Sequence, residues 1–303
     1  MMITDLQEPA AFPVIEDELW TSKQRQASAI HEISYRACFK PQLPRYFIER
    51  FSEPGDTVYD PFTGRGTTII EAALMGRRVV SNDVNPLSRI LTEPRLLLPT
   101  LAEIEARLAL LHLEDSETGA HNISMFYHPK TEAELVALRT YLSTRRAEGC
   151  EDTADKWIRM IATNRLTGHS PGFFSVYTLP PNQATSRERQ LLINAKRNQS
   201  PDYRDIKKLI LKKTRILLHD LDAGQCALVR SIGQTALFLE GDARDTSRIP
   251  AESVQLTVTS PPFLDIVQYS ADNWLRCWFN CIDDKAVGRT ITMSRTVDEW
   301  SAV

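Results

Sequence analysis

The chain has 303 residues, of which 36 are Lys or Arg and 39 are Asp or Glu, and its net charge is −3. This length is enough for one or two domains with a large hydrophobic core. Because the balance is slightly acidic, composition excludes a protein that is basic throughout, and any nucleic-acid surface has to be local.

The five cysteines are scattered and include no C-x-x-C pair, which argues against a disulfide framework and against a zinc site. No apolar run reaches the length needed to cross a bilayer, and the acidic N-terminus is unlike a secretory signal. We therefore expect a soluble, cytoplasmic protein with no metal and no membrane partner.

Residues 1–30 are polar and mixed in character, and we assign them to an N-terminal arm. The next stretch, 31–44, contains Phe39, Lys40 and Pro41 and leads into a helix predicted to end at Pro54-Gly55. Taken alone, this stretch is as well explained by a loop with Phe39 as its hydrophobic anchor as by a segment that covers a ligand.

Residues 57–74 predict a buried strand, a glycine turn and a helix. Asp60 follows the strand at its carboxyl end, where open α/β sheets bind ligands. Gly64 and Gly66 can adopt backbone angles that are closed to other residues, and they let a ligand approach the main chain. The candidate ligand-binding residues of this turn are Asp60, Pro61, Phe62, Gly64, Gly66, Thr67 and Thr68.

The whole string Asp-Pro-Phe-x-Gly-x-Gly-Thr-Thr resembles the S-adenosylmethionine loop of the amino-methyltransferases, which methylate exocyclic amines of DNA bases. The resemblance implies an α/β fold, namely a Rossmann-like class I methyltransferase sheet, with S-adenosylmethionine as cofactor. It also implies that the stretch around Phe39, Lys40 and Pro41 closes over the methionine end of that cofactor.

A second strand is predicted at 79–83, and it ends in Asp83, followed by Asn85-Pro86. A carboxylate about 20 residues after a glycine turn can bind ribose hydroxyls. The alternative is an ordinary strand-end Asp that caps the next helix. Because the glycine loop precedes it, we interpret Asp83 and Asn85 as cofactor-binding residues.

Residues 100–230 have helical periodicity, with helices predicted at about 101–113, 131–146 and 153–166. An irregular aromatic stretch follows, and then residues 187–215 contain ten Lys or Arg against three acids. Phosphate neutralisation needs such a run, although a solvated helix face has the same pattern. We interpret 100–230 as a helical insert that recognises DNA, with candidate contacts at His169, Phe173, Phe174, Lys196, Arg197, Lys207, Lys208, Lys212 and Lys213.

The strand pattern resumes at 235–243 and again at 254–259. The first of these strands leads to Gly241, Asp242 and Ala243. In the family that the chain resembles, an Asp at this place hydrogen-bonds the adenine amino group of the cofactor, which makes Asp242 and Ala243 cofactor-binding candidates. The second strand leads directly into Ser260-Pro261-Pro262-Phe263.

This tetrapeptide resembles the catalytic motif of the amino-methyltransferases. An exocyclic amine is a weak nucleophile, and a hydroxyl at Ser260 and the carbonyl of Pro261 can accept its two hydrogens. Pro261 and Pro262 hold the main chain so that these acceptors stay aimed at the amine. Phe263 can stack on a base that has been rotated out of the duplex. Serine at the first position favours cytosine N4 as the target.

The resemblance implies a catalytic domain made of residues 31–99 and 231–303. The family has three more strands after the tetrapeptide, so we expect that C-terminal strands are missing. The alternatives are a truncated chain, one subunit of a split enzyme, and a sheet that a second subunit or a homodimer completes. The predicted function is site-specific methylation of double-stranded DNA, in a restriction–modification or phage-defence system. The alternatives are an adenine-N6 DNA or RNA base methyltransferase, and a non-catalytic recognition or partner subunit of a split methyltransferase.

Overall fold

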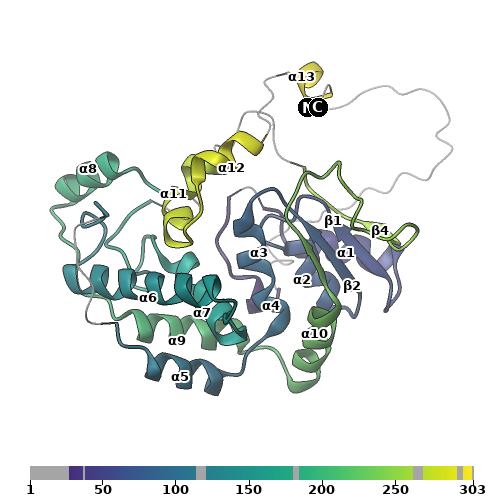
Figure 1. Cartoon of the computed structure of the whole chain (residues 1–303), viewed down its shortest axis with the longest axis horizontal. Coiled ribbons are helices and arrows are strands. Elements are labelled where there is room, and N and C mark those ends of the chain that lie inside the picture. The colour runs from purple at the N-terminus through teal and green to yellow at the C-terminus, as the bar shows by residue number, and fades with distance from the viewer. Residues whose placement is uncertain are drawn as a thin grey trace.

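The computed structural model describes residues 27–36, 38–113, 121–179, 184–261, 269–291 and 296–301. Within these ranges the chain forms a four-stranded parallel sheet in the order β3-β2-β1-β4, with helices against one of its faces and beside it (Figure 1). The predicted α/β class is thereby confirmed. The strands are β1 (Thr57–Asp60), β2 (Arg78–Asn82), β3 (Leu237–Leu239) and β4 (Leu256–Thr257).

Successive residues of the strands face opposite sides of the sheet, as strand geometry requires. Val58 and Val79 belong to the large hydrophobic core, whereas Tyr59 and Val80 belong to a small cluster on the other side. On the large-core side, the sheet is covered by α2 (Thr67–Leu74) and α10 (Ala223–Thr235), and α1 (Gln42–Phe51) contacts α2. The connection between β3 and β4 covers the small cluster on the other side.

Most of the helices lie beside the sheet, at the left in Figure 1. The three helices predicted in this region are confirmed, with ends that differ by at most three residues. The main hydrophobic core continues from the sheet into this region without a break. The helices are α3 (Pro86–Thr92), α4 (Pro94–Leu97), α5 (Leu101–Leu110), α6 (Pro129–Ala147), α7 (Thr153–Arg165), α8 (Arg187–Arg197) and α9 (Ile206–Leu218).

The helix starts follow from capping residues in the sequence. In α7, the side chain of Asp152 accepts a hydrogen bond from the amide of Asp155, whose own side chain reaches back to the amide of Asp152. Thr100 and Glu103 form the same reciprocal cap on α5. Such caps bond amides that have no partner inside the helix, so each fixes where its helix begins.

The remaining elements are the 3₁₀ turn η2 (Ala29–His31) and the helices α11 (Tyr269–Phe279), α12 (Asp284–Thr290) and α13 (Val297–Ser301). Helix α11 is the first described element after the Ser-Pro-Pro-Phe motif. It contacts α7 and α12, and so it returns the chain to the helical region. Among the described residues, no helix combines the length and the apolar character that crossing a membrane demands.

Candidate functional site

The carboxyl ends of β1 and β4 lie side by side, although these strands are far apart in the chain. The amide of Val258 donates to the carbonyl of Tyr59 at 3.1 Å. The Thr259 hydroxyl donates to Asp60 Oδ1 at 2.6 Å. Ser260 and Pro261 follow directly, so the structure places the start of the tetrapeptide beside the glycine loop. Pro262 and Phe263 lie outside the described residues.

The glycine loop has the conformation that its sequence predicts. Gly64 has a φ of 53° and Gly66 a φ of 81°, both in the left-handed region that favours glycine. A Cβ atom at Gly66 would collide with the side chain of Thr92, whereas one at Gly64 would meet only the Tyr35 ring, at 3.7 Å, and the carbonyl of Phe62, at 3.9 Å. Thr67 and Thr68, both buried, begin α2 directly after the loop.

Asp83 holds the glycine loop against the end of β2. Its carboxylate accepts hydrogen bonds from the amides of Gly64, at 2.8 Å, and Asn85, at 2.9 Å. Asn85 in turn caps α3, because its side chain accepts from the amide of Leu87 at 3.1 Å. Burial raises the pKa of Asp83 to about 6, and the two amide hydrogen bonds oppose that rise. The Asp83 carboxyl group is therefore a hydrogen-bond acceptor at the end of β2 that becomes protonated at a pH closer to neutrality than an ordinary Asp.

Asp60 is the more deeply buried carboxyl group, with 1% of the residue exposed. Burial raises its pKa to about 7, although hydrogen bonds from Thr259 and from the amide of Phe62 favour the carboxylate. Among the described residues, no cation forms an ion pair with it. A positively charged ligand would supply that partner, and S-adenosylmethionine carries a sulfonium and an ammonium group, so the residues present fit this cofactor.

Asn82, at the end of β2, joins the end of β3 to the end of β1. Its side-chain amide donates to the carbonyls of Gly241, at 3.0 Å, and Pro61, at 3.3 Å. Asp242 and Ala243 follow Gly241 at the same edge of the sheet. The Asp242 carboxylate is paired with Arg244 at 2.5 Å, and this pairing lowers the pKa of Asp242 to about 2. Asp242 is therefore ionised and exposed, and both of its carboxylate oxygens accept hydrogen bonds from Arg244.

The segment before the glycine loop is fastened to it by Arg65, the residue between the two glycines. The Arg65 guanidinium donates to the carbonyls of Ile33, at 2.8 Å, and of His31 and Phe39, both at 3.4 Å. Phe39 is half-buried and Lys40 is exposed. Pro41 is buried and stands at the N-cap of α1. The predicted neighbourhood of this segment and the loop is thus present.

Sequence reasoning missed Arg65 and Thr259. Arg65 occupies the variable position of the G-x-G pattern, and Thr259 is an ordinary β-branched strand residue. Nothing in a single sequence separates these two from their neighbours, because their roles depend on partners that are distant in the chain.

The aromatic loop proposed to meet DNA is partly turned inward. Phe173 and Phe174 are 5% and 0% exposed, and their rings fill the interior of the loop. His169 is exposed, with its ring centre 6.5 Å from that of Phe173. Tyr177 is 38% exposed, and the guanidinium of Arg197 lies 3.8 Å from its ring centre. Among the aromatic and charged residues of this surface, His169 and the Tyr177–Arg197 pair are therefore accessible.

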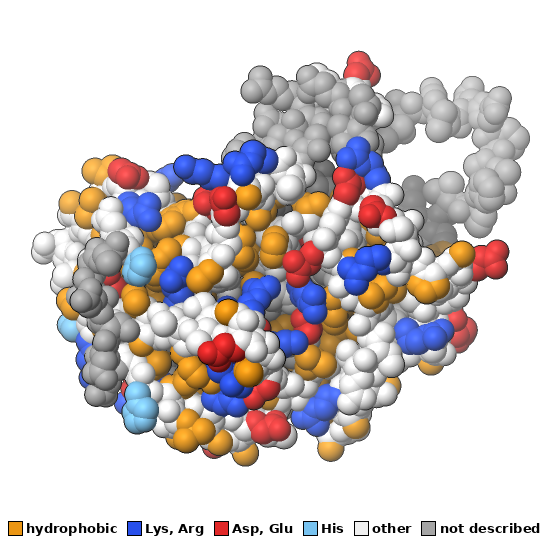
Figure 2. Space-filling view, viewed as in Figure 1, with side chains coloured by type: hydrophobic (Ala, Val, Ile, Leu, Met, Phe, Trp, Pro, Cys, Tyr) orange, Lys and Arg blue, Asp and Glu red, His pale blue; other side chains and the backbone are white. Residues whose placement is uncertain are grey.

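The lysines of the basic run are divided between different surroundings. Lys196, on α8, and Lys212, on α9, are exposed. Lys208 is exposed and pairs with Asp205 at 3.0 Å, and Lys207 donates to the carbonyl of Leu111. Lys213 is buried and pairs with Glu32 at 3.1 Å. On the face drawn in Figure 2, basic and acidic side chains are interspersed, so this face carries no single basic patch.

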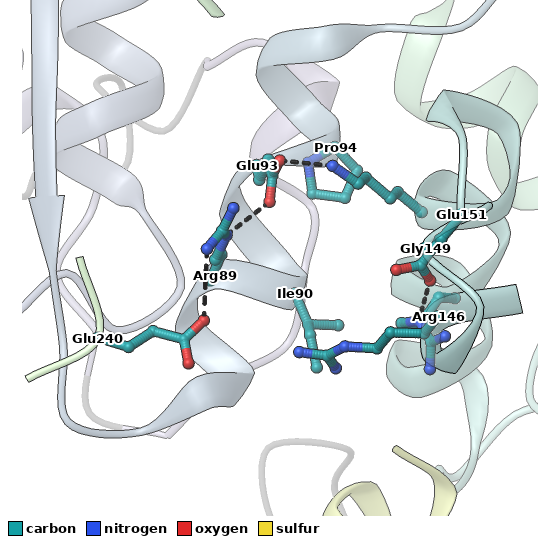
Figure 3. Close-up of a pocket in the computed structure, with 10 residues that line it drawn as sticks. Arg89, Ile90, Glu93, Pro94, Arg146, Gly149, Glu151 and Glu240 are labelled. Carbon is teal, nitrogen blue, oxygen red and sulfur yellow. Dashed lines mark hydrogen bonds and ion pairs between the residues drawn. The ribbon is translucent and has the colours of Figure 1, made fainter. Parts of the chain in front are cut away.

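A charged cavity of about 280 Å³ lies between α3 and the junction of α6 and α7 (Figure 3). Arg89 pairs with Glu93 at 2.8 Å and with Glu240 at 3.8 Å. Glu93 also pairs with Lys156 of α7 at 2.7 Å. A series of ion pairs therefore connects the end of β3 to the helical region.

In the ranges that the structure covers, no cluster of three or more His, Cys, Asp or Glu side chains is arranged to hold a metal ion.

Taken together, the fold and the site define a ligand-binding α/β protein with a glycine loop and three Asp side chains at adjacent strand ends. Residues 10–88 match the family model described as DNA methylase, which covers N6 and N4 methyltransferases. This part of the chain is therefore similar to the DNA amino-methyltransferases.

Three curated relatives are similar to parts of the chain. Type II methyltransferase M.MjaII of Methanocaldococcus jannaschii is 34% identical over 76 residues, covering 25% of this chain and 14% of the relative. M.BsoBI of Geobacillus stearothermophilus is 39% identical over 69 residues, covering 22% and 14%. M.MvaI of Kocuria varians is 30% identical over 97 residues, covering 31% and 20%. The similarity thus spans a fifth or less of each relative's length.

Proposed function

We propose that this protein is an S-adenosylmethionine-dependent, site-specific DNA methyltransferase that acts on an exocyclic amine, with cytosine N4 as the target. The observation that carries the proposal is the pairing of β1 with β4, which brings the glycine loop and Ser260 to neighbouring strand ends. The type II methyltransferase relatives support a restriction–modification setting.

We assign the sheet to the cofactor half of a Rossmann-like class I methyltransferase and residues 31–99 and 231–303 to the catalytic domain. The insert between them is our candidate for DNA recognition. Helix α10 straddles residue 230 and contacts α2 and β2, so we extend the catalytic domain backward to the start of this helix.

The residues of the site have separate tasks in this mechanism. The glycine loop and Asp60, Asp83 and Asp242 would bind and orient the cofactor, which would supply an electrophilic methyl group on a sulfonium. Ser260 Oγ and the Pro261 carbonyl would accept hydrogen bonds from the target amine and so favour a tetrahedral nitrogen. Positioning the amine in this way would supply most of the rate gain.

The test is a methylation assay with the whole chain and S-adenosylmethionine labelled in its methyl group. Unmethylated duplex DNA and tRNA are offered separately, and the products are digested to nucleosides and identified by mass spectrometry. We expect N4-methylcytosine from the duplex. N6-methyladenine would reassign the target base, and label in tRNA alone would reassign the substrate. Binding of cofactor and DNA without any transfer would favour a recognition or partner subunit.

A further inference from the structure

We propose that a pocket between the segment 32–35 and the helical insert holds a backbone phosphate of DNA, an inference that rests on the function proposed above. The pocket has a volume of about 460 Å³ and opens to the surface. Its walls are the segment 32–35, Arg65 of the glycine loop, Arg165 at the end of α7 and Lys213 on α9. The family resemblance assigns the neighbouring stretch around Phe39 to the cofactor, and it assigns no ligand to the pocket formed with Arg165 and Lys213.

The lining has more positive than negative charge. Arg65, Arg165 and Lys213 face a single acid, Glu32, whose side chain is 59% exposed. A fourth cation lies behind the wall, because buried Arg276 donates to the carbonyl of Ser34 at 2.9 Å. Burial and the nearby Arg276 lower the pKa of Arg165 to about 10. Burial and Arg165 likewise lower the pKa of Lys213, against its pairing with Glu32. An anion in the pocket would compensate this repulsion.

The cations differ in how many hydrogen-bond donors they have left. Arg65 is committed to the backbone carbonyls of the preceding segment. In Arg165, Nη2 donates to Asn164 Oδ1 at 2.6 Å, but Nε is buried and has no acceptor within the described ranges. Lys213 Nζ donates to Glu32, which leaves further protons unused. A phosphate, with several oxygen acceptors, would accept charge-assisted hydrogen bonds from Lys213 Nζ and would offset the charge of the Arg165 guanidinium beside it.

The position of the pocket explains why the anion would come from DNA. Tyr35 lines the pocket and also lies against the glycine loop, 3.7 Å from the place of a Gly64 Cβ. Arg165 lies 4.1 Å from the ring centre of Phe173, in the aromatic loop. The pocket therefore lies between the glycine loop, proposed to bind the cofactor, and the aromatic loop, proposed to contact DNA. An extruded nucleotide needs its flanking phosphates held near the site, and phosphate contacts fix register on the duplex.

The experiment compares Arg165→Gln and Lys213→Gln with Arg215→Gln in the whole chain. Arg215 is a matched control because it is on α9 but pairs with Glu105, outside the pocket. DNA binding is followed by fluorescence anisotropy over a salt series, and cofactor binding by calorimetry. We expect each pocket variant to lose about tenfold in DNA affinity. The slope of log K against log salt should become shallower by about one. The control slope and all cofactor affinities should stay unchanged.

If the pocket variants weaken cofactor binding and leave the DNA slope unchanged, the anion is the cofactor carboxylate and the proposal is overturned. A second measurement keeps the proposal separate from the proposed function. Inorganic phosphate, compared with chloride at equal ionic strength, should raise the melting temperature of the wild type and of Arg215→Gln but not of Arg165→Gln. That result would support the pocket even if the wild type bound no DNA, and no stabilisation of the wild type would overturn it.

Discussion

Asp60 and Asp83 are carboxyl groups whose pKa values are raised by burial, to about 7 and about 6. A carboxyl group with a folded-state pKa above its unfolded value takes up protons more readily in the native state. Without ligand, the stability contributed by these two groups therefore increases as the pH falls from about 7 towards the unfolded value near 4. Ligand binding that needs the carboxylate form has the opposite pH dependence, because it strengthens as the pH rises. The same two residues therefore destabilise the free protein at neutral pH and favour the complex.

The pH dependence of cofactor binding should report Asp60 and Asp83. A cation pairs with the carboxylate form of Asp60, and ribose hydroxyls donate to that of Asp83. Affinity should therefore be constant well above pH 7 and should fall as the pH drops through the pKa values of about 7 and about 6. The loss from each group should approach about tenfold for each further pH unit. Calorimetry with Asp83→Asn should show weaker binding that lacks the lower step. Asp242→Asn is the control, because the pKa of Asp242, about 2, lies outside the window. A lower step that persists in Asp83→Asn would assign that titration elsewhere.

The roles of Ser260 and Asp83 should separate in a pair of variants. Ser260→Ala removes a hydrogen-bond acceptor for the target amine, so kcat for methyl transfer should fall about 100-fold while cofactor affinity stays near the wild-type value. Asp83→Ala should weaken cofactor binding by about 1–3 kcal/mol, with a smaller effect at saturating cofactor. Equal losses of binding and transfer in both variants would contradict these assignments.

At the scale of elements, the unit of β1, glycine loop and α2 depends on two glycines for different reasons. Both have positive φ, but only Gly66 also lacks space for a side chain, because Thr92 of α3 fills it. The loop is thus held from one side by α3 and from the other by the segment that Arg65 binds. The sequence predicts both glycines as loop formers but does not show which of them faces open space.

We expect Gly66→Ala to destabilise the protein by about 2–4 kcal/mol, as the sum of left-handed strain and overpacking. Gly64→Ala should cost about 1 kcal/mol, from strain alone. Urea unfolding measures both. Adding Thr92→Ala to Gly66→Ala should recover part of the loss, because it removes the collision. Indistinguishable midpoints for the two single variants would show that Thr92 does not limit the loop.

At the scale of the whole molecule, the helical region and the sheet share one hydrophobic core and one chain of ion pairs. These ion pairs run from Glu240 through Arg89 and Glu93 to Lys156 of α7. They connect the strand end that carries Asp242 to the helices proposed to recognise DNA. The two regions are therefore expected to unfold together.

The link between Glu93 and Lys156 can be measured with a double-mutant cycle of Glu93→Gln and Lys156→Met. These side chains are 14% and 28% exposed, so solvent screens the pair in part. We expect a coupling free energy of about 0.5–1 kcal/mol that decreases with added salt. Arg45 and Glu49 form the comparison pair, since both are about half exposed, and their coupling should be smaller. A coupling of zero would show that this ion pair does not help to hold the two regions together.

The sequence was informative where the chemistry is local. Glycine spacing, strand-end acids and helix periodicity predicted β1, β2, α5, α6 and α7, and they indicated which edge of the sheet carries the site. Contacts between distant segments were not predictable in the same way. Lys213 reads as one more exposed lysine of a basic run, yet it is buried because α9 turns it towards Glu32. Phe173 and Phe174 read as free aromatics but fill their own loop, since the backbone of Gly168 lies against the Phe173 ring.

The hydrogen bond between Thr259 and Asp60 joins residues 199 positions apart in the chain. Closing so long a stretch costs entropy that local contacts never incur, and folds dominated by such contacts form slowly. During synthesis, the glycine loop and its flanking helices leave the ribosome long before β4 does. A nascent chain can therefore form the glycine loop and its flanking helices first, and it brings Ser260 beside that loop only at the last stage of folding.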